Sequence, residues 1–186
     1  MEAAKRDPGA GRRRSADPGG RAENSGQGKG RRAGAARAGT RRVESRGRAR
    51  ALQAVYAWDV RSGPPVGLEG TAGPQLVRTG EQVWEDLAVA PDERRQARRL
   101  VRALSERMPL LDRELEVVAT NWRLERMSVV DRCVLRLAAA ELAALDTPPR
   151  VVIQEAVRLA ERYGSSQSAH FVNGVLDALA RRTGRL

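Results

Sequence analysis

The chain has 186 residues, with 34 basic and 23 acidic side chains and one cysteine. A single cysteine excludes an intramolecular disulfide and a zinc site built from several cysteines. No apolar run approaches the roughly 20 residues that a membrane span needs, and the amino terminus lacks the apolar segment of a secretion signal. Composition therefore predicts a soluble, cytoplasmic protein with one ordinary domain or two small bundles.

The excess positive charge lies at the amino terminus, because residues 1–50 hold 15 of the basic and five of the acidic residues. Met1 and Val43 are the only large apolar residues before residue 44, so this segment buries too little surface to offset its ordering entropy. We predict a disordered Arg/Gly-rich basic tail at residues 1–43 and a folded domain at residues 44–186. Arginine suits phosphate contacts, although a GC-rich genome would also enrich it.

Helical periodicity begins near Glu44, and the Gly63-Pro64-Pro65 run ends this first helix. A weaker helical pattern covers residues 75–88. From Asp92 the apolar stripe strengthens into a third helix, and Pro109 predicts a bend or a fresh start before a shorter segment at residues 110–118.

The second half of the chain carries clearer helix boundaries. Ser128, with Asp131 three residues later, resembles a helix-starting cap, and the apolar stripe that comes after it makes Cys133 a plain buried thiol. The next helix opens at residues 146–148 and ends at Tyr163-Gly164, and the last runs over residues 166–182. No run alternates at period two for long enough to be a strand. The body is therefore predicted to be all-α, with about seven helices.

Two residues fit their predicted helices poorly. Gly174 stands in the middle of the last helix, where glycine costs about 1 kcal/mol relative to alanine, so close helix approach or a ligand is expected to offset the cost. Glu141 is the odd member of an apolar stripe. An internal salt bridge with Arg132 or Arg136 would explain a carboxylate at this position.

The chain offers few groups for catalysis. His170 is the sole histidine; Ser166 lies one turn from it, but Asp177 lies two turns along the same predicted helix and cannot orient the ring from the far side. No nucleophile elbow, phosphate-cradling glycine loop or metal-binding motif is present in the sequence. We predict that the protein is not an enzyme and uses neither a metal nor a cofactor.

Two groups of residues favour nucleic-acid binding. The first is a set of arginines flanking the start of the first helix, which could lie along a phosphate backbone or could be a solvated charge run: Arg41, Arg42, Arg46, Arg48 and Arg50. The second is one aromatic residue with neutral hydrogen-bonding residues around a turn, as single-stranded RNA sites often have: Tyr163, Ser165, Ser166, Gln167, Ser168, His170 and Asn173. Ser165 and Ser166 could equally serve only to cap the last helix.

Four segments, in order, resemble the NusB family of transcription antitermination factors: residues 53–56, 130–138, 153–157 and 171–177. The resemblance runs from about Arg46 to Leu179. It implies an all-helical fold of two packed bundles without enzymatic activity. It also implies binding of boxA-type single-stranded RNA, most tightly together with the ribosomal small-subunit protein NusE.

By position, the resemblance implies roles for particular residues. Arg46 and Arg48 match the family's basic arm, and residues 163–173 match its RNA-proximal turn. Tyr56 and Glu141 match its NusE-facing side, although Tyr56 could instead be a core aromatic with its hydroxyl at the surface. Ser166 and Gln167 stand where the family usually carries acids, and we predict that this loss of negative charge strengthens RNA binding or loosens its selectivity.

These observations predict a transcription antitermination or termination factor that joins RNA polymerase with other Nus factors, serves ribosomal-RNA transcription and could form a homodimer. One alternative is an RNA-binding module that serves a ribosomal-RNA cytosine methyltransferase. Such an enzyme needs a catalytic domain with a cofactor-binding glycine loop and a nucleophilic cysteine, which this sequence lacks. The other alternative is a helical scaffold with no nucleic-acid role.

Overall fold

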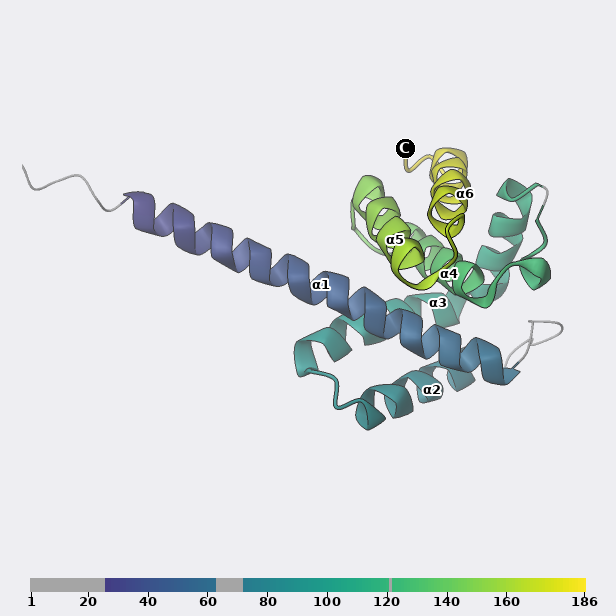
Figure 1. Cartoon of the computed structure of the whole chain (residues 1–186), viewed down its shortest axis with the longest axis horizontal. Coiled ribbons are helices and arrows are strands. Elements are labelled where there is room, and N and C mark those ends of the chain that lie inside the picture. The colour runs from purple at the N-terminus through teal and green to yellow at the C-terminus, as the bar shows by residue number, and fades with distance from the viewer. Residues whose placement is uncertain (1–25, 63–71, 121) are drawn as a thin grey trace, which may run out of the picture. The chain divides into compact units, whose positions relative to one another are not determined.

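The computed structural model describes residues 26–62, 72–120 and 122–186. Every regular element in these residues is helical (Figure 1). The elements are α1 (Gly26–Ser62), α2 (Ala72–Asp86), α3 (Pro91–Val118), the short 3-10 helix η1 (Leu124–Arg126), α4 (Val129–Ala144), α5 (Pro149–Tyr163) and α6 (Ser168–Arg182). The chain divides into two units, and the second, Arg37–Leu186, holds most of α1 and all of the other helices.

The prediction of an all-α fold is confirmed, with six α-helices and one 3-10 turn in the described residues where about seven helices were expected. The difference arises at Pro109, which lies inside α3 and does not divide it. The helix continues because Leu104, Met108, Leu111 and Leu115 keep one buried stripe on both sides of the proline. Burying that stripe offsets the roughly 3 kcal/mol that an interior proline costs.

Helix α1 begins at Gly26, whereas disorder was predicted as far as residue 43. The side chains described between Ala36 and Arg42 are exposed, so tertiary burial does not explain this part of the helix. Arginine and alanine both favour helix, and no proline follows Pro18 until Pro64. The rest of the predicted tail, residues 1–25, lies outside the described residues, as does the predicted loop at residues 63–71.

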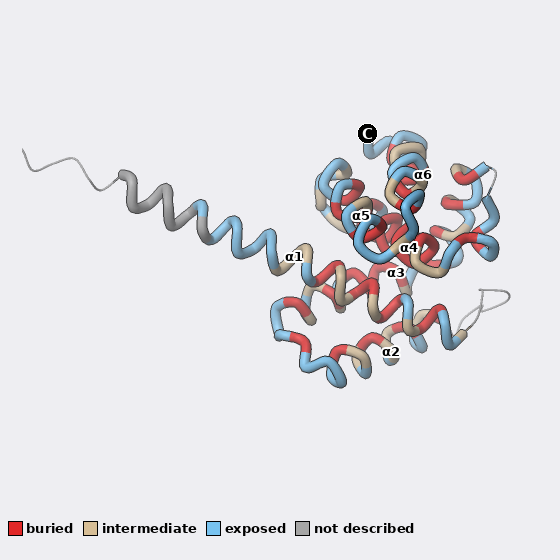
Figure 2. Tube along the Cα trace, in the orientation of Figure 1, coloured by how far each residue is buried: buried red, intermediate tan, exposed pale blue. Residues whose placement is uncertain are grey.

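The helices of the second unit pack in two groups that share α3. Helix α2 packs on α3, while α4, α5 and α6 pack on one another and α3 also contacts α4 and α6. Each helix turns its buried residues inward (Figure 2). Cys133 is fully buried in α4, as predicted, and burial raises the pKa of its thiol to about 12. No described helix combines the length and apolar character needed to cross a bilayer.

A buried ion network joins α1 to α4 and α3. Asp59 of α1 accepts hydrogen bonds from Arg132 at 2.9 Å and from Arg136 at 2.8 Å, and Arg136 also donates to Asp112 of α3 at 2.8 Å. Arg136 has no exposed side-chain surface, and its guanidinium lies 5.9 Å from the centre of the Trp58 ring. Because each buried charge has a partner, the network holds α1 in place without leaving an unpaired ion.

Candidate nucleic-acid interface

Arg48, predicted to contact RNA, lies in the interior and is 4 % exposed. Its Nε donates to Glu141 Oε2 at 3.0 Å, and its Nη2 donates to Glu141 Oε1 at 2.6 Å. Its other amino nitrogen, Nη1, lies 4.0 Å from a carboxylate oxygen of Glu155. Arg48 is therefore a structural residue that ties α1 to α4 and α5, and its assignment to RNA is corrected.

Glu141 was predicted to face a partner protein, but it is 2 % exposed. Both of its carboxylate oxygens accept hydrogen bonds from Arg48. The alternative of an internal salt bridge is the correct one, although its partner comes from α1 and not from Arg132 or Arg136. Those two arginines are held by Asp59, so the carboxylate on the apolar stripe pairs across the helix interface instead.

The remaining arginines of the predicted arm differ in whether they form ion pairs within the protein. Arg46 and Arg50 both pair with Glu93 of α3, at 3.3 and 3.2 Å, and Arg50 also donates to Gln53. Arg46 keeps 59 % of its side chain exposed. Arg41 and Arg42 are exposed, and neither forms an ion pair with a described residue. The free positive charge on this stretch therefore lies at residues 41 and 42.

Beside Arg41 the surface is hollowed between α1, α3 and the start of α5, with a volume of about 600 Å³. Arg99 of α3, which has no ion-pair partner among the described residues, and Arg158 of α5, paired with Glu155, add guanidinium groups. The other lining residues are Glu44, Ser45, Asp146, Thr147, Pro148, Val151 and Gln154. The sequence did not single out Arg99, because a linear pattern does not show which helix faces Arg41.

The predicted turn between α5 and α6 is mostly open to solvent. Tyr163 is 42 % exposed, with the Arg162 guanidinium 5.4 Å from its ring centre. Gln167, His170 and Asn173 are exposed as well. These side chains present one aromatic ring and several neutral hydrogen-bonding groups on the same short segment, so the turn can meet unpaired bases.

Ser168 departs from that prediction, because it is 1 % exposed. Its Oγ accepts a hydrogen bond from the Ser165 backbone N–H at 2.9 Å and lies 3.0 Å from Ser165 Oγ, so the two serines hold the turn together. A Cβ at Gly164 would lie 2.5 Å from Ser168 Oγ, which explains the glycine there. No side chain forms a cap hydrogen bond at the start of α6, so the capping alternative is wrong, and Ser165 remains exposed as well as bonded.

Gly174 is exposed, and a Cβ built on it would have no neighbour within 4 Å. The expectation that close helix approach explains this glycine is therefore wrong. The open space adjoins Asn173 and lies one turn beyond His170 on α6. A ligand passing over this face remains the available explanation for the residue.

On α1, Tyr56 and Val60 are 45 % and 56 % exposed and lie one turn apart. Asp59 lies one turn after Tyr56 and accepts a hydrogen bond from Arg132 of α4. The residue before Arg132 in the sequence is Asp131. Asp131 is 9 % exposed, and its buried Oδ1 has no hydrogen-bond partner among the described residues. Sequence reasoning identified Asp131 only as part of a helix cap, and its backbone N–H does donate to the N-cap Ser128.

The family model described as the NusB family matches residues 45–181 of this chain. The chain belongs to the NusB family. The transcription antitermination protein NusB of Sorangium cellulosum is 43 % identical over 145 residues, which cover 77 % of this chain and 96 % of that protein. The NusB of Anaeromyxobacter dehalogenans strain 2CP-1 is 42 % identical over 139 residues, which cover 73 % of this chain and 89 % of that protein.

Solved structures agree with this NusB assignment. NusB from T. maritima superposes with a TM-score of 0.63 at 33 % identity, covering 74 % of this chain and 90 % of that one. A crystal structure of antitermination factors NusB and NusE in complex with dsRNA superposes with a TM-score of 0.62 at 26 % identity, covering 76 % of this chain and 98 % of that one. The predictions of the NusB family, its fold and a transcription antitermination protein that is not an enzyme are confirmed.

Proposed function

We propose that this NusB-family protein binds boxA-type single-stranded RNA together with NusE and thereby helps to assemble an antitermination complex on RNA polymerase with other Nus factors. In this proposal it acts in the cytoplasm and serves ribosomal-RNA transcription. The observation that carries the proposal is its likeness to the NusB of the NusB–NusE–RNA complex, at 26 % identity over nearly all of that chain. In this proposal the protein acts by binding RNA and proteins and catalyses no reaction.

The RNA is proposed to contact α1 through its free arginines. Residues 26–50 contain nine basic residues and one acidic residue, so most of the excess positive charge of residues 1–50 belongs to this helix. Arg41 and Arg42, with the exposed part of Arg46, are the groups left to neutralise phosphates. Arg99 adds a further guanidinium across the hollow.

The second proposed contact is the turn between α5 and α6. Tyr163 offers a ring for stacking, and Ser165, Gln167, His170 and Asn173 offer donors and acceptors to base edges. Open space above Gly174 lets a strand approach the helix backbone. Such groups suit unpaired bases, so we propose a single-stranded ligand even though the related complex contains dsRNA.

The NusE contact is proposed at Tyr56. Its exposed ring and Val60 give an apolar surface. Glu141, the acidic residue predicted for this surface, is buried and is left out of the proposed contact. The first unit, with the rest of the predicted tail at residues 1–43, is proposed to add nonspecific electrostatic attraction.

Fluorescence anisotropy of a labelled RNA tests the proposal. The full chain is titrated into a boxA-like single strand, a scrambled strand of equal length and a duplex, with and without NusE, at two salt concentrations. Tighter binding of the boxA-like strand, enhanced by NusE, is expected. Equal binding of both strands, lost at the higher salt and indifferent to NusE, would leave only charge attraction and would contradict the proposal.

The same titration addresses the two alternatives. A helical scaffold without a nucleic-acid role would bind none of the RNAs at low salt. A module serving a ribosomal-RNA methyltransferase would bind RNA but gain nothing from NusE.

A further inference from the structure

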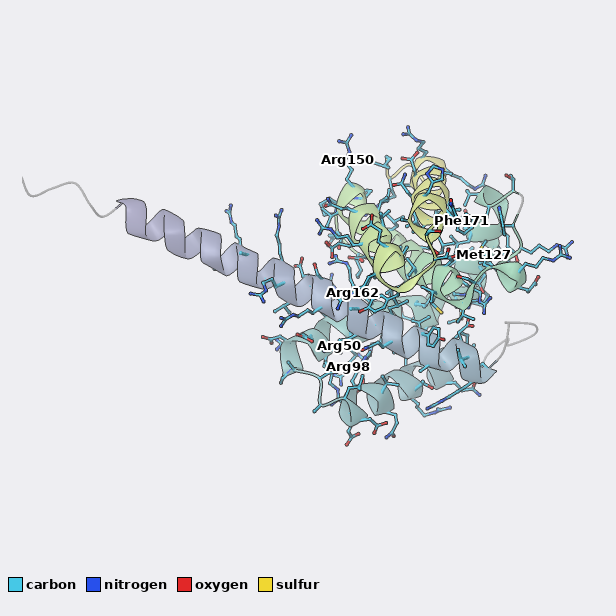
Figure 3. All side chains as sticks on the ribbon, in the orientation of Figure 1. Arg50, Arg98, Met127, Arg150, Arg162 and Phe171 are labelled. Atoms are coloured by element: carbon cyan, nitrogen blue, oxygen red, sulfur yellow. The ribbon has the colours of Figure 1, made fainter. Side chains whose placement is uncertain are left out.

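Trp122 is a large aromatic residue that the proposed function has not used. It follows α3, is 55 % exposed, and its ring centre lies 5.6 Å from that of Phe171 at an interplanar angle of 59°. Phe171, labelled in Figure 3, belongs to the first turn of α6 and directly follows His170. Trp122 therefore extends the surface of the α5–α6 turn onto the segment before η1.

A hollow of about 600 Å³ lies beside the exposed indole. Arg123 and Arg126 line it, both are exposed, and neither forms an ion pair within the described part of the chain. The remaining lining residues are Glu116, Ala119, Thr120 and Glu125. Two free guanidiniums beside an exposed ring are the groups that hold a phosphate and stack a base in single-stranded nucleic-acid sites.

We propose that Trp122 is a base-stacking platform for single-stranded RNA and that Arg123 and Arg126 hold a flanking phosphate. Phe171 packs against the indole at a tilted angle, so that the ring is positioned before RNA arrives. This inference rests on the proposed RNA-binding function and adds a contact to it, on the α6 side of the turn. The occupant is the same strand that passes over His170 and Asn173.

The charges that line the hollow indicate whether electrostatic attraction or base stacking contributes more to RNA binding at this site. Glu116 and Glu125 balance the two arginines in number, so long-range attraction to this site is weak. Stacking must then supply most of the contact, and the arginines act only on a phosphate close to them. The most informative measurement therefore monitors the indole itself.

The three tryptophans make that measurement possible. Trp58 and Trp84 are each 1 % exposed, so Trp122 is the one that a quencher or a base reaches directly. Unlabelled boxA-like RNA is titrated into the full chain while tryptophan emission and acrylamide quenching are recorded. We expect RNA to reduce the emission and to protect the acrylamide-accessible component, with a midpoint that matches the anisotropy curve.

Variants separate stacking from fluorescence. W122F retains a ring and removes the reporting indole, so it should abolish the RNA-dependent change in emission and keep the affinity within about two-fold. W122A should weaken RNA binding by about ten-fold, in line with other base-stacking residues. The double variant R123Q/R126Q should weaken binding several-fold, whereas R78Q/R107Q, a matched pair of exposed arginines without ion-pair partners among the described residues, should not.

The outcomes distinguish this inference from the function on which it rests. RNA binding by the wild-type chain without any change in Trp122 emission, or with unaltered affinity in W122A, would overturn the platform and leave the RNA function standing. A change in emission on adding NusE alone, absent in W122F, would assign the surface to a protein partner and also overturn it. No RNA binding by the wild-type chain would overturn both. If W122A fails to fold, the wild-type emission data still decide.

Discussion

The arginines near the start of the NusB-family domain and the polar turn between α5 and α6 look equally available in the sequence, yet the structure uses them differently. Arg48 is buried against Glu141, and Arg46 and Arg50 share Glu93. At the turn, Tyr163, Gln167, His170 and Asn173 remain exposed, whereas Ser168 is buried and forms hydrogen bonds with Ser165.

The comparison shows that a charged residue is free only if no complementary residue packs against it. Guanidinium groups reach far and find carboxylates on neighbouring helices, whereas neutral side chains on an outward turn meet no helix that could pair with them. Arg50 and Arg98, labelled in Figure 3, pair in this way with Glu93 and Glu81. Substitutions at both kinds of position can establish which polar groups serve the fold and which remain for a ligand.

The largest effect is expected for Asp59→Asn. This change leaves Arg132 and Arg136 without the carboxylate that both contact, and an uncompensated buried charge costs about 3–5 kcal/mol of unfolding free energy. Urea unfolding followed by circular dichroism measures the loss. Asp177→Asn, which removes an exposed partner of Arg181, is the control and should cost less than about 1 kcal/mol. If both variants lost the same unfolding free energy, the buried network would contribute no more to stability than an exposed ion pair.

Arg48→Gln and Arg42→Gln separate a structural arginine from a free one. Arg48→Gln should lower the unfolding free energy by about 3 kcal/mol, because it leaves Glu141 buried without its partner. Arg42→Gln should change stability by less than about 0.5 kcal/mol but weaken RNA binding several-fold and flatten its salt dependence. Urea unfolding and anisotropy give the two readouts. The reverse pattern would place Arg48, not Arg42, on the RNA.

Gly174→Ala tests the open face of α6. A Cβ there meets nothing within 4 Å, so the substitution should stabilise the fold by about 0.4–1 kcal/mol through the lost freedom of the unfolded chain. The melting temperature should rise accordingly. Weaker RNA binding in this more stable variant would identify Gly174 as a place of close approach to RNA, and a destabilised variant would contradict the open geometry.

Gln167→Asp tests whether the neutral turn strengthens RNA binding. The added negative charge is exposed and should weaken binding a few-fold at low salt, with less effect at higher salt because ions screen it. Gln75→Asp on α2 places the same charge on another exposed position and serves as the control. If the two variants bind RNA with the same affinity at low salt, the turn does not read RNA through its charge.

The smallest effect is expected where α2 and α3 pair at the surface. The hydrogen bond from Arg98 lowers the pKa of Glu81 to about 2. Because the folded pKa lies below the ordinary value of about 4.5, this pair stabilises the fold above about pH 5 and ceases to do so as the pH falls toward 2. Glu81→Gln should therefore reduce the difference in melting temperature between pH 7 and pH 3. An unchanged difference would show that the pair, which is about one-third exposed, contributes nothing.

The sequence by itself determined the helical class, most helix boundaries and the exposure of the turn, because apolar periodicity and caps such as Ser128 act within a few residues. It also predicted the buried Cys133 thiol. It missed the continuity of α3 through Pro109, where packing on both sides outweighs the local cost of proline. The partners of Arg48, Glu141 and Asp59 were decided only by the tertiary structure, since they lie 73 to 93 residues apart and meet only when the helices pack. The same holds for the pairing of Trp122 with Phe171, which no linear pattern could reveal.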